Sequence, residues 1–155
     1  MKKSYIIPLQ IEKDSYKPCI EFLNTVSKDE ECIFFIDSNG GDANSAFKIG
    51  NKILEGYQVK AYVLAGAFSA AFIILQCCKI RIANRTAKFL LHFPKYANGS
   101  TDFAQLKGHY VFLKYLSNRT GHSIRFLWEH CRKDSDITAE EALKLNFIDE
   151  IIEKK

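Results

Sequence analysis

Short apolar runs alternate with segments of helical spacing along the first half of the chain, and this alternation limits the possible folds more than any other feature. The run CIFFI at 32–36 is continuous, as in a strand that is covered on both faces, and 59–64 indicates a second strand. Residues 15–27 and 43–55 carry apolar side chains at helical intervals. Strands that alternate with helices predict an α/β fold with right-handed crossovers.

The second half of the chain is expected to be richer in helix. Residues 95–101 are polar and turn-like, whereas 103–118 predict a long amphipathic helix that begins near Asp102. Thr138 and Glu141 have the spacing of a capping box, which marks the start of a short helix. No repeat and no linker rich in Pro, Gly or Ser divides the chain, so we expect one domain over residues 1–155. The remaining expected elements are strands at 4–9, 80–83, 88–91 and 148–152 and helices at 69–78 and 123–132.

Composition argues against several classes of function. The 155 residues are 47% hydrophobic and 26% charged, as in a soluble globular protein. The net charge of +4 is interspersed with acids and forms no basic stripe, which argues against nucleic-acid binding. The N-terminal apolar run is too short for a signal peptide. Ala61–Cys78 lacks charge but is interrupted by Gly66 and Gln76, so we expect a strand, a turn and a buried helix there, and no membrane association.

The cysteine pattern favours free thiols. There are five cysteines, an odd number, and they form no CxxC pair and no Cys/His spacing of the kind that binds metal. We therefore expect a reducing compartment, the cytoplasm, and neither a metal nor another cofactor. The five are Cys19, Cys32, Cys77, Cys78 and Cys131.

A glycine-rich turn follows the apolar run at 32–36. In the segment SNGGD at 38–42, two glycines permit backbone angles that other residues resist and leave N–H groups free to approach a ligand. Such groups can bind a developing oxyanion. The alternative is a tight turn into a helix that Asp42 caps. No phosphate-binding motif of the type GxxxxGK[ST] is present.

Ser69 is the strongest candidate nucleophile. It lies in AGAFSAA, where small residues surround one hydroxyl at the expected junction of a strand and a helix. A nucleophilic serine needs little steric cover and gains from the N–H groups of a helix N-terminus, here that of Ala70. Ala67 and Ala71 replace the glycines of a GxSxG elbow, so that motif is not matched. The alternative is a serine that only caps the helix.

His92 is the candidate base. Within the segment LLHFP it ends an apolar strand and precedes a turn, so the strand would hold the imidazole at the edge of a cleft. A general base has to be held in this way, within reach of the proton that it removes. Most single histidines are not catalytic. The support for a catalytic His92 comes only from the order and spacing of its segment relative to the two earlier segments.

Taken together, these segments resemble the proteolytic subunits of the Clp protease family. The runs FFIDSNGGD, AGAFSAAF and LLHFP follow the order of the family's N-S-P-G-G-S, G-x-A-A-S-M-G and M-I-H-Q-P segments. Downstream, LSNRTGHSI and DITAEEALKLNFIDEII are similar to the family's LSERTGQSI and FLTAEEAxEYGLIDxVL. The resemblance extends from about residue 6 to residue 152, and the set of motifs is far more specific than any one of them.

The resemblance implies both a fold and a mechanism. The implied fold is the ClpP/crotonase-like spiral of βαβ units, and the implied activity is that of a serine peptidase. Ser69 would be the nucleophile and His92 the general base, with the backbone N–H groups of Gly41 and Ala70 as the oxyanion hole. The substrate would be a peptide or an unfolded protein, bound as an added strand beside the site.

The family's catalytic triad has an aspartate as its third member, and this chain has no aspartate at the corresponding position. Counting without a gap from Gly121 puts His130 where the family has its aspartate, and a histidine cannot supply a fixed negative charge. Three interpretations remain open. Asp134 or Glu129 could replace the acid, a Ser–His dyad could work slowly without one, or the protein could be a non-catalytic homologue.

The assembly is also expected to differ from the family's. The segment from His92 to Gly121 is several residues shorter, and it lacks the glycine-rich strand and the start of the helix that joins two rings. We also expect this chain to lack the N-terminal loop that gates the family's pore. We expect a homo-oligomer, a ring or smaller, and these gaps argue against docking to an AAA+ unfoldase.

Three functional classes follow from these observations. The first is an ATP-independent peptidase subunit. The second is a scaffold or regulatory subunit that assembles with an active paralogue, which the histidine at position 130 would suit. The third is an acyl-CoA enzyme of the crotonase class, which is disfavoured because no acid closely follows Gly66 or Ser69.

Overall fold

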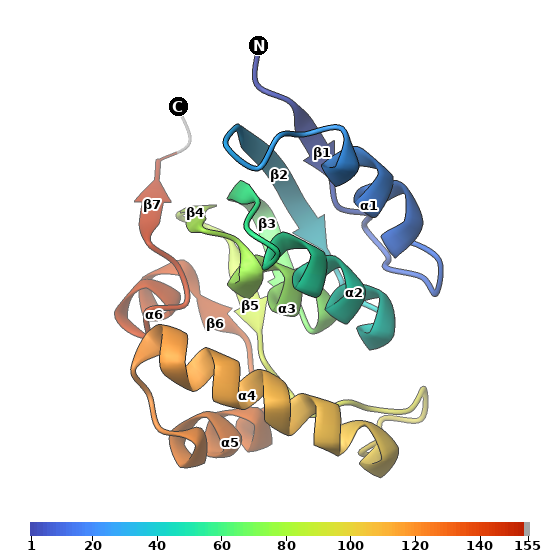
Figure 1. Ribbon diagram of the computed structural model, residues 1–155. Helices are drawn as coiled ribbons and strands as arrows, with labels where there is room; N and C mark the ends of the chain where they lie inside the picture. Colours follow the sequence, from blue (N-terminus) through green and yellow to red (C-terminus); the bar gives the residue numbers. More distant parts are fainter. Residues whose placement is uncertain (154–155) are drawn as a thin grey trace.

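A computed structural model describes residues 1–153 as a mainly parallel β-sheet with helices packed around it (Figure 1). The shorter strands β5 and β6 lie off the main path: β5 runs parallel to the end of β3, and β6 pairs with β5 in antiparallel fashion. The α/β fold expected from the sequence is confirmed. The main path consists of parallel strands in the order β1 (Ser4–Ile6), β2 (Glu31–Ser38), β3 (Gln58–Phe68), β4 (Ile80–Asn84) and β7 (Glu150–Ile152), while β5 spans Lys88–Leu90 and β6 spans Ile137–Thr138.

The helices follow the strands in the order that the sequence predicts. Figure 1 shows α1 and α2 packed along the sheet and the long α4 lying below it with α5 alongside. At Thr138 the expected capping box is present and opens α6. The helices are α1 (Tyr16–Asn24), α2 (Ala43–Ile53), α3 (Ala70–Cys77), α4 (Leu106–Thr120), α5 (Ile124–Lys133) and α6 (Ala139–Lys144), with a 3-10 turn η1 at Phe103–Gln105.

The long helix after the polar turn starts later than expected. The sequence predicted one helix over 103–118, but residues 103–105 form η1 and the α-helix begins at Leu106. Asp102 caps this turn, since its carboxylate accepts hydrogen bonds from the Ala104 N–H at 3.1 Å and the Gln105 side chain at 2.7 Å. These bonds favour a tight first turn, because a capping side chain satisfies the free N–H groups there.

Strand β2 is fully covered on one face only, so the expectation of a strand covered on both faces is wrong. Its buried side chains alternate with half-buried ones, in the two-residue period of a strand. On the covered face Phe34 lies 6.2 Å, centroid to centroid, from Phe22 of α1. On the other face Phe35 stacks on Tyr62 of β3, and both remain partly exposed. An uninterrupted apolar run thus gave no information about which face the helices cover.

Strand β3 is long because it serves two neighbours in succession. Its first part, 60–63, pairs with β4, and its last part, 66–68, pairs with β5. Between them the register against β2 shifts, since Ile36 faces Val63 but Ser38 faces Ala67. Such a bulge re-aims the end of a strand. It brings the residue after β3, Ser69, beside both the glycine-rich turn after β2 and the end of β5.

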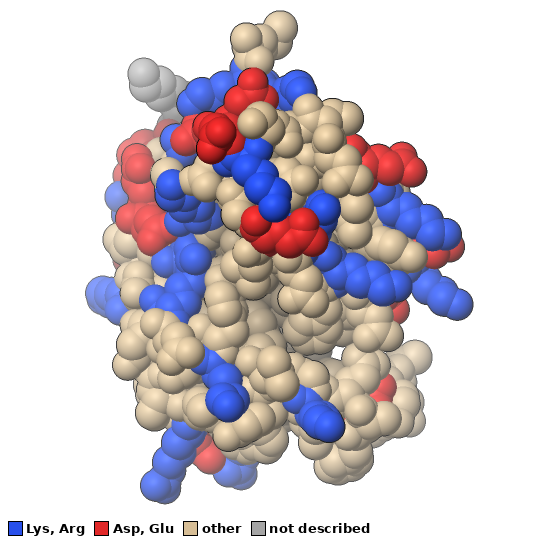
Figure 2. All heavy atoms as spheres, viewed as in Figure 1, with Lys and Arg blue, Asp and Glu red and all other residues tan. Residues whose placement is uncertain are grey.

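The uncharged segment 61–78 is divided between β3 and α3, as the sequence predicted. Within residues 1–153 no helix is long and apolar enough to cross a membrane. All eight residues of α3 are buried, which accounts for the apolar character of this stretch. The five cysteines are buried and unpaired in the structure. Figure 2 shows basic and acidic side chains interspersed on the upper half of the visible face, whereas the lower half, over α4, is mostly uncharged.

Candidate active site

Ser69 occupies a sharp turn between β3 and α3. Its backbone has φ 55° and ψ −116°, a conformation that residues with a side chain rarely adopt. The Ser69 N–H donates to the Leu90 carbonyl of β5 at 2.9 Å, and the Ser69 carbonyl accepts from the Phe72 N–H at 2.9 Å. The surrounding strand and helix therefore hold the turn in place. Strain of this kind costs roughly 1–3 kcal/mol and is often found at functional sites.

The hydroxyl of Ser69 is not used to cap the helix. Ser69 stands at the N-cap position of α3, but its side chain makes no capping hydrogen bond. The capping serines and aspartates of this chain behave differently: Ser123 accepts from the Phe126 N–H and Asp42 from the Ser45 N–H. A hydroxyl that is free of such a structural task is available to a ligand. The alternative of a serine that only caps does not describe this geometry.

The glycine-rich turn lies against the Ser69 turn. A Cβ at Gly40, whose φ is +87°, would lie 2.4 Å from the Phe68 carbonyl oxygen and 3.1 Å from the Ala70 nitrogen. Only a glycine allows the two turns to approach this closely. Asp42 caps α2, as the bland interpretation of this turn expected. Among residues 1–153 the Gly41 N–H donates to no other group, and Ala70, as the first residue of α3, also leaves its N–H without a helical partner.

His92 lies two residues after β5, with its side chain only 14% exposed. The hydrogen bond from Ser69 to Leu90 ties the nucleophile's turn to the strand that leads to His92. Burial lowers the pKa of His92 below its ordinary value, the Asp134 carboxylate acts to raise it, and the Lys95 ammonium acts to lower it further. The imidazole is therefore neutral near pH 7, which is the form that can accept a proton.

Asp134 is the carboxylate that the structure brings to His92. It follows α5 in the left-handed region, with φ 47° and ψ 48°. Its Oδ1 lies 3.7 Å from the His92 Nδ1, slightly beyond hydrogen-bond distance. Its Oδ2 is bound by the Lys95 ammonium. The buried His92 Nδ1 has no hydrogen-bond partner among the described residues.

Glu129 and His130 lie elsewhere. Glu129 is exposed and pairs with Arg132 one turn along α5. His130 packs with its ring 6.2 Å from that of Phe126 and 6.1 Å from that of Phe147. Counting without a gap therefore leads to the wrong side of α5. The helix continues to Lys133, and the chain turns toward His92 only at Asp134.

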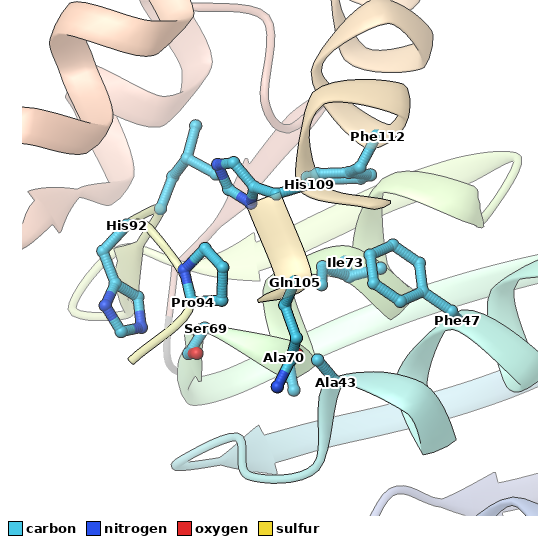
Figure 3. Close-up of a pocket in the computed structure, with 11 residues that line it drawn as sticks. Ala43, Phe47, Ser69, Ala70, Ile73, His92, Pro94, Gln105, His109 and Phe112 are labelled. Carbon is cyan, nitrogen blue, oxygen red and sulfur yellow. The ribbon is translucent and has the colours of Figure 1, made fainter. Parts of the chain in front are cut away.

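Ser69 and His92 line one small cavity. Its volume is about 30 Å³, and Figure 3 shows the Ser69 hydroxyl and the His92 ring at one end of it, near Pro94. Phe47, Ile73 and Phe112 form its apolar end. These three side chains also line an adjoining apolar pocket of about 270 Å³ between α2 and α4. No hydrogen bond joins Ser69 and His92 in the described structure, which is common before a substrate is bound.

Two further polar side chains of the cavity, His109 and Gln105, were not predicted from the sequence. His109 is 5% exposed, and burial lowers its pKa to about 4. Its Nε2 lies 3.4 Å from the Cys131 Sγ, and its ring contacts Phe93 edge-on. A signal did exist, because His109 shares helical spacing with the buried Phe112, Leu113 and Leu116.

Comparison with known proteins identifies the family of this chain. The model of the family described as Clp protease matches residues 3–155. The chain belongs to the Clp protease family. A curated relative, the ATP-dependent Clp protease proteolytic subunit 1 of Bacillus cereus, is 25% identical over 144 residues, which cover 86% of this chain and 75% of the relative.

Solved structures of the Clp protease family share the fold. ClpP1 from Listeria monocytogenes superposes with a TM-score of 0.84 at 19% identity, covering 98% of this chain and 92% of the other. The N165D mutant of the same protein gives a TM-score of 0.82 at 20% identity, with 99% and 92% covered. The family and fold expected from the sequence are thus confirmed, and the chain is a ClpP-like α/β protein.

Proposed function

We propose that this chain is a serine peptidase that cleaves peptides or unfolded protein through an acyl-enzyme. The observation that carries the proposal is the Ser69 hydroxyl, which is held in a strained turn, does not cap its helix and faces the same cavity as His92. Membership of the Clp protease family supports a peptidase in general. The roles of Ser69 and His92 are those that the family resemblance implies, and their shared cavity supports them.

In the proposed reaction the Ser69 Oγ attacks the carbonyl carbon of a peptide bond. His92 takes the hydroxyl proton as the Oγ–carbon bond forms. The carbon–nitrogen bond then breaks, and His92 gives its proton to the departing amine. A water molecule attacks the resulting ester with the help of the same imidazole, which releases the acid product and restores Ser69.

The Gly41 and Ala70 N–H groups would stabilise the negative charge that develops on the carbonyl oxygen. Neither group is needed by the fold, since the Gly41 N–H has no acceptor within residues 1–153 and the Ala70 N–H opens a helix. Donors that are already oriented cost no reorganisation during the reaction, and one of them contributes about 3–4 kcal/mol in a comparable oxyanion hole.

Asp134 would orient the imidazole. A carboxylate that accepts from the Nδ1–H of the base leaves the other nitrogen free to take the proton from serine. Asp134 is 3.7 Å from this atom, so a small rotation of its side chain would form the bond. Glu129 is paired elsewhere and lies on an exposed part of α5.

The apolar lining near the site indicates which kind of substrate side chain would bind. The adjoining apolar pocket of about 270 Å³, which Phe47, Ile73 and Phe112 also line, would accept a bulky apolar side chain next to the bond that is cut. The peptide would lie extended along the glycine-rich turn and the segment after His92. We also propose a homo-oligomer that works without an unfoldase, in the cytoplasm, where buried free thiols such as Cys131 stay reduced.

Hydrolysis of fluorogenic peptides tests the proposal. The wild type should cleave a peptide with leucine or methionine before the reporter faster than one with aspartate there, and Ser69→Ala should cleave neither. Ser4→Ala, which removes an exposed hydroxyl from β1, should behave as the wild type. Cleavage that survives in Ser69→Ala would refute the assigned nucleophile.

One observation favours a second function, that of a non-catalytic subunit that assembles with an active paralogue. The His92 Nδ1 has no partner, and the carboxylate nearest to it is bound by Lys95. A chain without any peptidase activity that raises or redirects the activity of a paralogue in mixed oligomers would support this function. A chain that is active as a homo-oligomer would exclude it.

A further inference from the structure

Lys95 is a cation bound to Asp134 at the side of the candidate site, and the proposed reaction does not require it. It lies three residues after His92, and its ammonium binds the Oδ2 of Asp134. Both side chains are about one-third exposed, at 30% and 35%. The imidazole beside them is much less exposed, and its Nδ1 is left without a hydrogen bond.

The two segments that carry Lys95 and Asp134 are each anchored by the backbone. Lys95 pairs with Thr101 in an antiparallel bridge, and the Asp102 N–H closes the same turn by donating to the Pro94 carbonyl at 2.7 Å. Asp134 is fixed in the left-handed conformation at the end of α5. The freedom that remains lies in the side chains, so the direction of the carboxylate is decided by its partners.

Lys95 and His92 compete for this carboxylate. A buried polar nitrogen without a partner is costly, and a hydrogen bond from the His92 Nδ1 to Asp134 would remove that cost. The structure instead shows the ammonium bound and the imidazole 3.7 Å away. The ammonium also acts on the imidazole directly, since it lowers the pKa of His92, whereas Asp134 raises it.

We propose that Lys95 is a positioning residue that holds the Asp134 carboxylate out of hydrogen-bond reach of His92, so that the site rests in a weakly reactive arrangement. The inference rests on the proposed function, because it concerns the reactivity of the same Ser69–His92 pair. Lys95, which is not a member of the triad, thus controls when Asp134 completes it. Removal of the ammonium frees the carboxylate to turn toward the imidazole.

The rate at which a small fluorophosphonate labels Ser69 at neutral pH measures this control. In the labelling step Ser69 Oγ bonds to phosphorus, fluoride leaves and His92 takes the proton. Lys95→Met should label about three- to tenfold faster than the wild type, a modest gain because a partly exposed ion pair is weak. Lys95→Arg, which keeps the charge, should stay near the wild type, and Lys88→Met, an equal charge change on the exposed side of β5, should have no effect.

Asp134→Asn distinguishes positioning from a general effect of charge. Added to Lys95→Met, it should abolish the gain in labelling rate, because the amide cannot replace the carboxylate. A Lys95→Met variant that labels at the wild-type rate or more slowly would overturn the inference, as would a gain that survives Asp134→Asn.

A spectroscopic readout separates this inference from the peptidase proposal. In proton NMR, an Nδ1–H of His92 that is hydrogen-bonded to a carboxylate should give a far-downfield resonance in Lys95→Met, absent from the wild type and from the double variant. If that resonance appears while no variant takes up the probe, the peptidase proposal fails and the role of Lys95 stands. If the wild type already shows it, or Lys95→Met lacks it, the role of Lys95 is refuted whatever the labelling.

Discussion

The two halves of the candidate site are held by different kinds of interaction. The nucleophile half, residues 38–42 and 66–73, lies where β2, β3 and α3 meet, and backbone hydrogen bonds and close glycine contacts fix it. The acid half, residues 92–95 and 134, lies on a turn and at a helix end, where one ion pair and one unsatisfied nitrogen face each other. The first half can hardly change without unfolding, whereas the second can change by a side-chain rotation.

This difference indicates where activity could be gained or lost. The glycine contact at Gly40 and the strained backbone of Ser69 both involve the packing of the sheet against α3, so substitutions there should appear as changes in stability. An exposed ion pair contributes little to folding, so its loss should appear in reactivity. The following predictions challenge this division.

The largest effect is expected at Gly40 of the nucleophile half. Gly40→Ala should lower the free energy of unfolding by about 3–5 kcal/mol, because the new Cβ would lie 2.4 Å from a backbone oxygen at a positive φ. Gly108→Ala is the matched control, since its Cβ would meet nothing within 4 Å, and it should stabilise α4 by up to about 1 kcal/mol. Urea unfolding measures both. A loss below about 1 kcal/mol at Gly40 would show that the two turns are not tightly packed.

His109, which faces the cavity between the two halves, should make stability depend on pH. Its pKa is about 4 in the folded protein and near 6.5 when unfolded, so the unfolded chain binds the proton first as the pH falls. The contribution of the buried, neutral His109 to the free energy of unfolding is therefore complete above about pH 6.5 and is lost as the pH falls toward 4. Between pH 7 and pH 4 the wild type should lose about 3 kcal/mol more than His109→Phe. The free energy of unfolding at each pH comes from urea titrations. An equal loss in the wild type and in His109→Phe would contradict the burial of a neutral His109.

The backbone strain at Ser69 should be measurable as a difference in stability between a glycine and an alanine at this position. Ser69→Gly should be more stable than Ser69→Ala by about 1 kcal/mol, because glycine adopts φ 55° without the steric penalty. Thermal or urea unfolding of the two inactive variants makes the comparison. Equal stability would mean that the nucleophile half stores no strain at this residue.

The smallest effect is expected in the acid half. Lys95→Met should change the free energy of unfolding by less than about 1 kcal/mol, since the pair with Asp134 is partly exposed. Urea unfolding of Lys95→Met measures this change, with Lys88→Met as the control variant. A loss above about 2 kcal/mol would place Lys95 among the residues that hold the fold and would blur the division between the two halves.

The sequence predicted the nucleophile half better than the acid half for a physical reason. Turns at the ends of buried strands leave local signals, such as two glycines together or small residues around a serine, and these signals made Ser69 and Gly41 candidates. The position of Asp134 depends on how far α5 continues and where it turns, which the sequence left open among three interpretations. The ion pair of Lys95 joins segments 39 residues apart and left no local trace.

Errors in the predicted elements have a similar origin. The run at 32–36 identified β2 but not the face that the helices cover, because helix placement is decided by distant residues such as Phe22. The long helix opens with a 3-10 turn that Asp102 caps, and helical spacing alone does not distinguish such a turn from an α-helix. The helical spacing of His109 marked it as buried, but no local pattern indicated that it lines the same cavity as Ser69.

Covalent labelling can decide whether Ser69 and His92 act together on one carbonyl or phosphoryl group. After treatment with a fluorophosphonate, peptide mass mapping should find the adduct on Ser69, and His92→Ala should slow labelling by about a hundredfold or more. No adduct, an adduct on another residue, or labelling that ignores the loss of His92 would contradict the account.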